Sequence, residues 1–292
     1  MKIADSELII NPDGSIFHLH IKPGQLASTV ILVGDPGRVK KISGYFDEII
    51  FQGENREFVW KTGVYNKHRF TVLSTGIGTD NIDIVLTELD AVMNVDFETR
   101  TVKEQKQSLN IVRIGTSGAM QSEIPVDGWL LSEQSIGFDG LLNYYAGRNE
   151  VCDLDFEKAF TKFVEWNSSL PSPYVNKANA EMVSKIMHPS IIKGITISAS
   201  GFYGPQGRVV RLNLANPELN NKISIFEYNG KRITNFEMEC SAIYGLSDLL
   251  GHKAVTICVV IANRKEGTFS KNYDIPMTKL IEHVLKSLSN SY

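Results

Sequence analysis

The sequence predicts an α/β fold with one central, mixed β-sheet, partly barrel-like, flanked by helices. Two observations carry this prediction. Short apolar runs bounded by glycine or polar residues recur along the chain, which is typical of buried strands. Between them lie longer stretches with apolar residues on one helical face. Such a mixture indicates a sheet that is covered by helices on both faces.

Six segments are expected to form strands: residues 29–33, 70–73, 111–114, 129–131, 195–199 and 254–262. The first three are expected to lead into Gly-rich turns at Gly34, Gly76 and Gly115. Pro36 suits the first turn of a helix, and Gly251 suits the end of one. The expected helices cover residues 36–46, 81–95, 154–164, 239–250 and 280–288.

The chain has 292 residues, a length that at about 150 residues per domain would allow two domains. No Pro/Gly/Ser-rich boundary divides it. The polar segment 96–108 is interpreted as a solvated excursion between a helix and a strand. We therefore expect a single domain that spans residues 1–292.

Charge and cysteine usage exclude several classes of protein. There are 30 Lys and Arg against 33 Asp and Glu, which argues against a dedicated nucleic-acid binder. No apolar run of about 18 residues predicts a membrane span, and the N-terminus lacks the pattern of a signal peptide. Cys152, Cys240 and Cys258 show neither CxxC nor metal-site spacing. We expect a cytoplasmic protein without a metal site and with Cys240 buried in a helix.

Two of the expected turns combine glycine with arginine. Gly34 is followed by Arg38, and Arg113 precedes Gly115 and Thr116. Glycine lets backbone N–H groups approach an anion closely, and the guanidinium fork suits phosphate. Each turn alone is more typical of an ordinary strand-to-helix connection. Because two such turns occur, a phosphate-binding site and a pair of ordinary strand-to-helix connections are about equally favoured.

A second cluster is the pair of carboxylates that flanks Met238. Periodicity favours the interpretation that Glu237 and Glu239 are acids in the first turn of a helix, where they complement the macrodipole. The alternative is that one carboxylate accepts hydrogen bonds from sugar hydroxyls.

A third cluster follows the strand expected at 195–199. Gln206 offers a donor and an acceptor, and Arg208 offers only donors, so together they could bind a planar cyclic imide. Phe202 could stack on such a ring. The alternative is a surface loop with an exposed arginine.

In this order, these segments resemble the uridine phosphorylase branch of the nucleoside phosphorylase family, from residues 17–19 to 261–264. The resemblance implies a nucleoside phosphorylase-like fold and a pentosyltransferase activity. The implied reaction is the reversible phosphorolysis of uridine to uracil and ribose 1-phosphate, a step of pyrimidine salvage. Inorganic phosphate would be a co-substrate, and no cofactor is implied.

The resemblance also assigns residues to the parts of the site. It implies that Arg208, Arg113 and Gln206 are the catalytic groups: Arg208 and Gln206 would stabilise charge that develops on the base, and Arg113 would position phosphate. The residues that match phosphate ligands are Gly34, Arg38, Arg56, Arg113 and Thr116; those that match ribose ligands are His18, Glu237, Met238 and Glu239; those that match base ligands are Phe202, Gln206, Arg208 and Arg264.

Arg56 and His18 match residues that serve the site of a neighbouring subunit, so the resemblance implies a homo-oligomer, at least a dimer, with shared sites. Ser200 stands where purine-specific relatives have an aspartate, and this favours a pyrimidine base. Asn81 replaces a serine that is linked to potassium in some relatives, which leaves a monovalent cation open.

Two alternatives remain at this point. One is a phosphorylase with broader specificity or with a preference for thymidine or purine nucleosides. The other is a non-catalytic nucleoside- or phosphate-binding protein on the same scaffold, since a fold does not fix a function.

Overall fold

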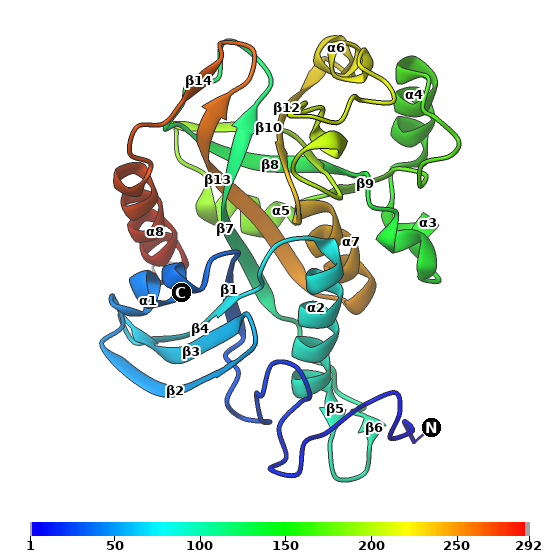
Figure 1. Ribbon diagram of the computed structural model, residues 1–292. Helices are drawn as coiled ribbons and strands as arrows, with labels where there is room; N and C mark the ends of the chain where they lie inside the picture. The colour runs from blue at the N-terminus through cyan, green and yellow to red at the C-terminus, as the bar shows by residue number, and fades with distance from the viewer. Residues whose placement is uncertain (1, 290–292) are drawn as a thin grey trace.

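The computed structural model describes residues 2–289 and has the predicted α/β architecture (Figure 1). A twelve-stranded mixed sheet forms the centre of this part of the chain. A separate two-stranded sheet, formed by β5 (Val95–Asp96) and β6 (Thr101–Val102), lies near the N-terminal end. The strands of the large sheet are β1 (Thr29–Val33), β2 (Glu48–Asn55), β3 (Phe58–Tyr65), β4 (His68–Ser74), β7 (Asn110–Ala119), β8 (Trp129–Gly137), β9 (Tyr174–Lys177), β10 (Ile191–Ser198), β11 (Glu227–Tyr228), β12 (Lys231–Glu237), β13 (Lys253–Asn263) and β14 (Thr268–Phe269).

Part of this sheet closes on itself. Strands β4, β1, β7 and β13 are parallel neighbours, and β13 then pairs antiparallel with β8. From β8 the sheet continues through β10 to β12, which pairs back onto β7. The strands β7, β13, β8, β10 and β12 therefore form a closed ring, and the prediction of a mixed, partly barrel-like sheet is confirmed.

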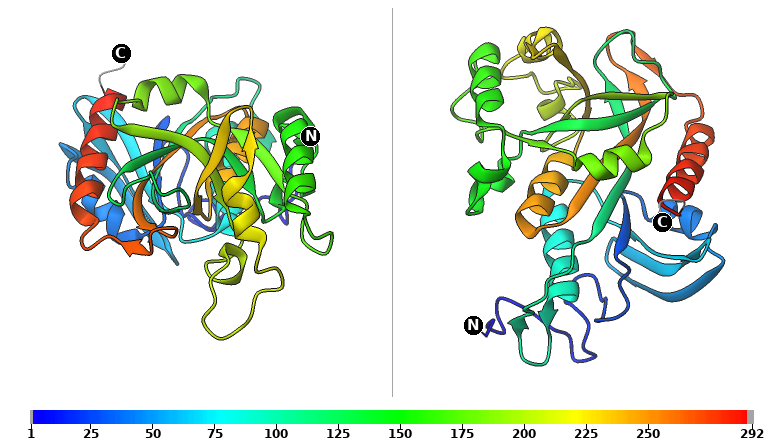
Figure 2. Two further views of the ribbon diagram at one scale, coloured as in Figure 1. Left: turned by 90° about the horizontal axis from the view of Figure 1, so that it is seen from above. Right: turned by 180° about the vertical axis from the view of Figure 1, so that it is seen from behind.

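Helices cover the sheet on both faces (Figures 1 and 2). None of the helices within residues 2–289 combines the length and the apolar character needed to cross a membrane. The α-helices are α1 (Pro36–Ser43), α2 (Thr79–Asn94), α3 (Arg148–Val151), α4 (Leu154–Val164), α5 (Ala180–Ile186), α6 (Leu219–Ile225), α7 (Cys240–Leu250) and α8 (Asp274–Ser289). Two 3₁₀ turns lie at Leu141–Tyr144 and Gly204–Gln206.

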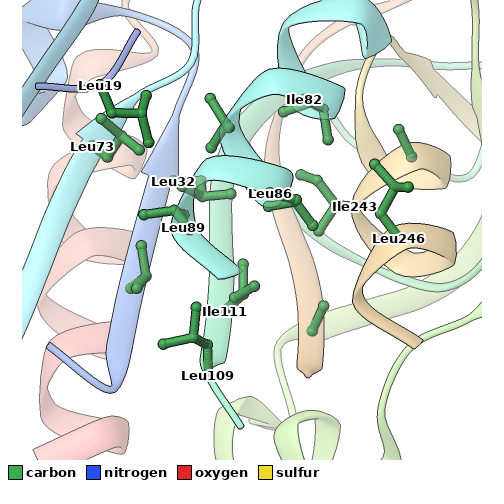
Figure 3. Close-up of a cluster of buried hydrophobic side chains, with 14 of the residues drawn as sticks. Leu19, Leu32, Leu73, Ile82, Leu86, Leu89, Leu109, Ile111, Ile243 and Leu246 are labelled. Atoms are coloured by element: carbon green, nitrogen blue, oxygen red, sulfur yellow. The ribbon is translucent and has the colours of Figure 1, made fainter. Parts of the chain in front are cut away.

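The core follows the alternation of side chains along the strands. Leu32 of β1 faces the cluster under α2 and α7, where Leu86 and Ile243 meet (Figure 3). Its neighbour Ile31 faces the opposite cluster, under α1, α5 and α8. A third cluster lies beneath α4 and α6. Since successive side chains of a strand point to opposite faces, a continuous apolar run serves both clusters.

Several local expectations are confirmed. β1 and α4 have the predicted bounds, and the other four predicted helices overlap α1, α2, α7 and α8. Pro36 begins α1 after Asp35, whose carboxylate accepts from the Gly37 N–H at 2.8 Å. Gly251 ends α7 in the left-handed conformation. Helix α1 stops at Ser43 because Gly44 caps it, so the expected extension to residue 46 is wrong.

Other expectations need correction. The strand predicted at 111–114 does not end at Gly115, because β7 continues to Ala119 while paired with β13 and β12. Strands β2, β3, β5, β6, β9, β11, β12 and β14 lie outside the predicted segments. β2 is mostly exposed and so carries no continuous apolar run, the signal used for strands.

The polar segment 96–108 includes β6 and is anchored to the N-terminal segment. The Ile3 N–H donates to the Arg100 carbonyl at 2.8 Å, and Arg100 Nε donates to the Ile3 carbonyl at 3.2 Å. One connected sheet links residues 29 to 269, as a single domain requires. The predicted domain bounds also include Met1 and residues 290–292, which lie outside the described residues.

We predict that Tyr244→Phe destabilises the ring. The Tyr244 hydroxyl donates to the Ser132 carbonyl at 2.6 Å and accepts from the Thr256 N–H at 2.8 Å, which joins α7 to β8 and β13. Its loss removes a buried partner from both backbone groups, so the free energy of unfolding should fall by about 2–4 kcal/mol. Chemical denaturation measures this change. The matched variant Tyr144→Phe, at a residue that is 88% exposed, should change the free energy of unfolding by less than about 0.5 kcal/mol. Equal losses in both variants would contradict the prediction.

Candidate active site

A cavity of about 900 Å³ opens at the carboxyl ends of β1, β4, β7, β12 and β13. Ligands gather at this edge in α/β sheets. Eleven of the predicted site residues line it: Gly34, Arg38, Arg113, Thr116, Phe202, Gln206, Arg208, Glu237, Met238, Glu239 and Arg264. Arg56 and His18 are not among the lining residues.

Arg38 contributes a positive charge to the cavity, and the nearby Asp35 carboxylate offsets part of the lowering of its pKa. It lies in α1, and its Nη1 donates to the Ile114 carbonyl at 3.2 Å. Burial lowers the pKa of Arg38, and the positive charge of Arg113 lowers it further. Within residues 2–289 no carboxylate forms an ion pair with Arg38, so its charge is available to an anion in the cavity.

Arg113 is buried and is held by two carboxylates. Its Nη1 lies 3.1 Å from Glu237 Oε2, and its Nη2 contacts Glu239 Oε2. Burial by itself would lower the pKa of Arg113, but Glu239 and Glu237 outweigh burial and raise it above its ordinary value. The guanidinium therefore stays charged although the side chain is buried.

The two glutamates are not acids of a first helical turn, so the interpretation that periodicity favoured is wrong. Glu237 is the last residue of β12, and Glu239 is the N-cap of α7. Both are buried. Periodicity could not reveal this arrangement, because it depends on the partner strand that supplies Arg113.

The carboxylates differ in how many hydrogen bonds they can still accept. Glu237 accepts from the N–H groups of Glu239 and Cys240 and from the Ser198 hydroxyl, besides its contact with Arg113. Each oxygen of Glu239 has a single donor: the Gly78 N–H at 2.8 Å and Arg113. A carboxylate has about four acceptor positions. Glu239 is therefore the one with capacity for the hydroxyls of a sugar.

The glycine at the middle of β7 has a steric role. The predicted phosphate-binding turn at 115–118 is part of the strand. A Cβ on Gly115 would lie 2.3 Å from Arg113 Nη1 and 3.0 Å from Cys258 Sγ. Gly115 thus leaves the space that the Arg113 side chain occupies. Next to it, the Ser117 hydroxyl is buried at the cavity wall without a partner among the described residues, which is unusual unless a ligand supplies one.

At the other end of the cavity, Arg208 and Gln206 act as a unit. Arg208 Nη1 donates to Gln206 Oε1 and to the Phe202 carbonyl, both at 2.5 Å. The guanidinium carbon lies 3.8 Å from the centre of the Phe202 ring. Burial lowers the pKa of Arg208. The segment that follows Gln206 projects from the body of the molecule (Figure 2, left).

Arg264 holds this loop from the opposite wall. It donates to the carbonyls of Gln206 and Gly207, the second at 3.2 Å. Burial lowers the pKa of Arg264, and the charge of Arg208 lowers it further. Its observed contacts are with the loop, so it orients Gln206 in addition to lining the cavity.

His18 and Arg56 lie together, outside the cavity. Arg56 is exposed in the turn between β2 and β3, with a φ of 54°. The neighbouring Asn55 donates to the His18 carbonyl at 2.8 Å. His18 Nδ1 lies 2.6 Å from Glu88 Oε1, and Glu88 also accepts from the His18 and Leu19 N–H groups. Glu88 therefore fixes Nδ1 as the donor and leaves Nε2 of His18 without this partner.

Glu88 and Glu57 are not among the predicted site residues. Glu57 lines the cavity and accepts from Asn81 Nδ2 at 3.0 Å, and the same Nδ2 donates to the Thr75 carbonyl at 2.9 Å. The Asn81 amide thus presents donors at the position considered for a cation. A signal for Glu88 was its acidic side chain on the apolar face of α2, where only 11% of that side chain is exposed.

Comparisons with known proteins agree with this geometry. The family model of the phosphorylase superfamily matches residues 28–288. The chain belongs to the phosphorylase superfamily. The prediction of a nucleoside phosphorylase, a pentosyltransferase, is confirmed.

Individual members of the superfamily resemble this chain over most of its length. A uridine phosphorylase of Thermococcus kodakarensis is 30% identical over 276 residues, which cover 92% of this chain and 85% of the relative. A DeoD-type purine nucleoside phosphorylase of Listeria monocytogenes is 25% identical over 244 residues, which cover 83% and 85%. A solved nucleoside phosphorylase of Trypanosoma brucei, described as showing uridine phosphorylase activity, superposes with a TM-score of 0.87 at 30% identity over 97% of this chain and all of the other.

We predict that Gly115→Ala weakens anion binding without unfolding the protein. The new methyl group would displace the Arg113 guanidinium, so affinity for inorganic phosphate should fall at least about tenfold. Isothermal titration with phosphate measures this. In the matched variant Gly44→Ala, the methyl group meets nothing closer than 3.4 Å at a negative φ, and affinity should be unchanged. Unchanged affinity in Gly115→Ala would contradict the steric role.

Proposed function

We propose that this protein catalyses the reversible phosphorolysis of uridine to uracil and ribose 1-phosphate. The observation that carries the proposal is the order of groups along one cavity. Arg38 and Arg113 stand at one end, Gln206 and Arg208 at the other, and Glu239 accepts between them. The first end suits phosphate, the other end suits the base, and the position between them suits the ribose. Relatives described as uridine phosphorylases support the same substrate.

In this proposal, catalysis rests on positioning and charge. Phosphate attacks C1′ from the face opposite the base while the glycosidic bond breaks, and the ribose passes through a state that resembles an oxocarbenium ion. Arg208 and Gln206 stabilise the negative charge that moves onto the uracil ring. Arg38, Arg113 and Thr116 hold the phosphate in line, and the phosphate charge itself stabilises the cationic sugar. Glu239 accepts from ribose hydroxyls, and Met238 packs beside the sugar.

A preference for a pyrimidine follows from the base end of the site. The Gln206 amide and Arg208 guanidinium complement the carbonyl and N–H groups of a uracil ring. Ser200 follows β10, is exposed and offers no acid for a purine N7. Broader specificity is the second candidate, because relatives named as purine nucleoside phosphorylases match most of the chain as well.

We further propose a homo-oligomer in which each subunit completes the site of its neighbour. His18 and Arg56 lie outside their own cavity although they match ribose and phosphate ligands. Glu88 holds His18 with Nε2 available, and Arg56 is exposed beside it. The cytoplasm is the compartment we propose, in accord with three free cysteines.

We predict that the protein releases uracil from uridine only when phosphate is present. Comparison of kcat/KM for uridine, thymidine and inosine gives the base preference. Arg208→Ala should lower kcat/KM for uridine by about a hundredfold or more and leave phosphate affinity nearly unchanged. Arg211→Ala, in the same loop but outside the cavity lining, is the matched control. No uracil release by the unaltered protein would refute the proposed function.

A further prediction concerns the active site that two neighbouring subunits would share. Arg56→Ala and Arg208→Ala should each be nearly inactive alone. When the two are unfolded and refolded together, mixed dimers contain one site with an intact Arg208 and an intact Arg56 from its neighbour. Activity should therefore return to about a quarter of the unaltered level if pairing is random and the interface has twofold symmetry. Mixtures that stay as inactive as the parents would show that Arg56 does not act across an interface.

A further inference from the structure

Behind the cavity, Glu237 contacts a serine that none of the assigned roles includes. Ser198 is the last residue of β10 and lies opposite Glu237 in the parallel pairing with β12. Its side chain is fully buried, and its Oγ donates to Glu237 Oε1 at 2.5 Å. Ser198 does not line the cavity, so it meets neither phosphate nor nucleoside directly.

The direction of this hydrogen bond is fixed by α7. The Ser241 N–H donates to Ser198 Oγ at 2.9 Å. Since this N–H can only donate, the hydroxyl proton of Ser198 is free to point at Glu237. The first turn of α7 is itself held: Ser241 Oγ and the Tyr174 hydroxyl both contact Asp139, the latter at 2.9 Å.

The charge of Glu237 depends on these donors. Burial raises the pKa of Glu237 above its ordinary value; Arg113 and the Ser198 hydroxyl oppose this rise, and the Glu239 charge adds to it. The titratable groups that face Glu237 are Arg113 from β7, Glu239 and Cys240 from α7, and Cys258 from β13. Arg113 is the only cation in this set.

We propose that Ser198 is a positioning residue: its hydroxyl keeps Glu237 ionised against Arg113 and so keeps Arg113 oriented towards phosphate. The proposal rests on the proposed function, because Arg113 is taken as the phosphate ligand. A chain of contacts then connects β10 to the site. The N-terminus of α7 orients Ser198, Ser198 donates to Glu237, and Glu237 pairs with Arg113. A neutral Glu237 would leave Arg113 with one carboxylate partner instead of two.

The test measures kcat/KM for uridine against pH in Ser198→Ala. Without the hydroxyl, Glu237 takes up its proton at a higher pH, so the acid limb of the profile should move upward by about one pH unit, a tenfold change in proton affinity. Ser198→Thr retains the hydroxyl and should restore the profile. In a Glu237→Gln background, which has no carboxylate to protonate, Ser198→Ala should cause no further shift.

A second measurement does not require activity. Denaturant midpoints of Ser198→Ala and the unaltered protein should differ most near pH 8 and converge as the pH falls through the range where Glu237 is protonated. The sign follows because the lost hydrogen bond stabilised only the ionised, folded form. A role in packing alone would give a difference that does not depend on pH.

The matched control is Ser135→Ala, at a buried serine whose hydroxyl has no partner among residues 2–289. It should move neither the acid limb nor the pH dependence of the midpoint. If the unaltered protein releases no uracil, the proposed function fails, and the denaturation series still tests the contact with Glu237. If uracil is released but Ser198→Ala keeps the unaltered acid limb, the positioning role of Ser198 is overturned and the proposed function stands.

Discussion

The ion-pair cluster of Arg113 with Glu237 and Glu239 is the constraint on which the site depends. A buried guanidinium is costly unless its charge is paired and its donors are satisfied. Here two carboxylates from the β12–α7 junction face an arginine from β7. The cluster therefore requires closure of the ring by β12 and β7, a glycine at position 115, and the N-terminus of α7 close to the strand ends.

Charge along the cavity is asymmetric, and this asymmetry suits a nucleoside with phosphate. Arg38 lacks a carboxylate partner among the described residues, whereas Arg113 has two. Arg208 and Arg264 carry positive charge to the far end, where burial lowers the pKa of both. Four arginines and four acidic side chains line the cavity, so its formal charges balance, as those of the whole chain nearly do. Of the acids that line the cavity, Glu237 and Glu239 hold Arg113, whereas Asp35 and Glu57 form no ion pair with it.

The site divides into groups on the rigid sheet and groups on connecting segments. Arg113, Thr116 and Glu237 are strand residues, so their spacing is fixed by ladder hydrogen bonds. Gln206 and Arg208 belong to a loop that Arg264 holds through two backbone carbonyls. Arg56 is exposed and His18 is half-buried, and neither lines the cavity. Under the proposed function, this division would place the phosphate and sugar contacts on the scaffold and leave the base contacts to the loop, where sequence can vary most.

The sequence by itself determined the fold class, the bounds of β1 and α4, and the eleven predicted residues that line the cavity. The fold class and the two sets of bounds follow from periodicity and capping residues, whereas the set of site residues follows from the resemblance of short motifs to the nucleoside phosphorylase family; all of these signals are local in the chain. Only the tertiary structure decided that residues 115–119 continue β7, that Glu237 and Glu239 clasp Arg113, and that Ser198 supports Glu237. The physical reason is that strand pairing and register join residues more than 100 positions apart, such as Arg113 and Glu239, and no local pattern specifies that pairing.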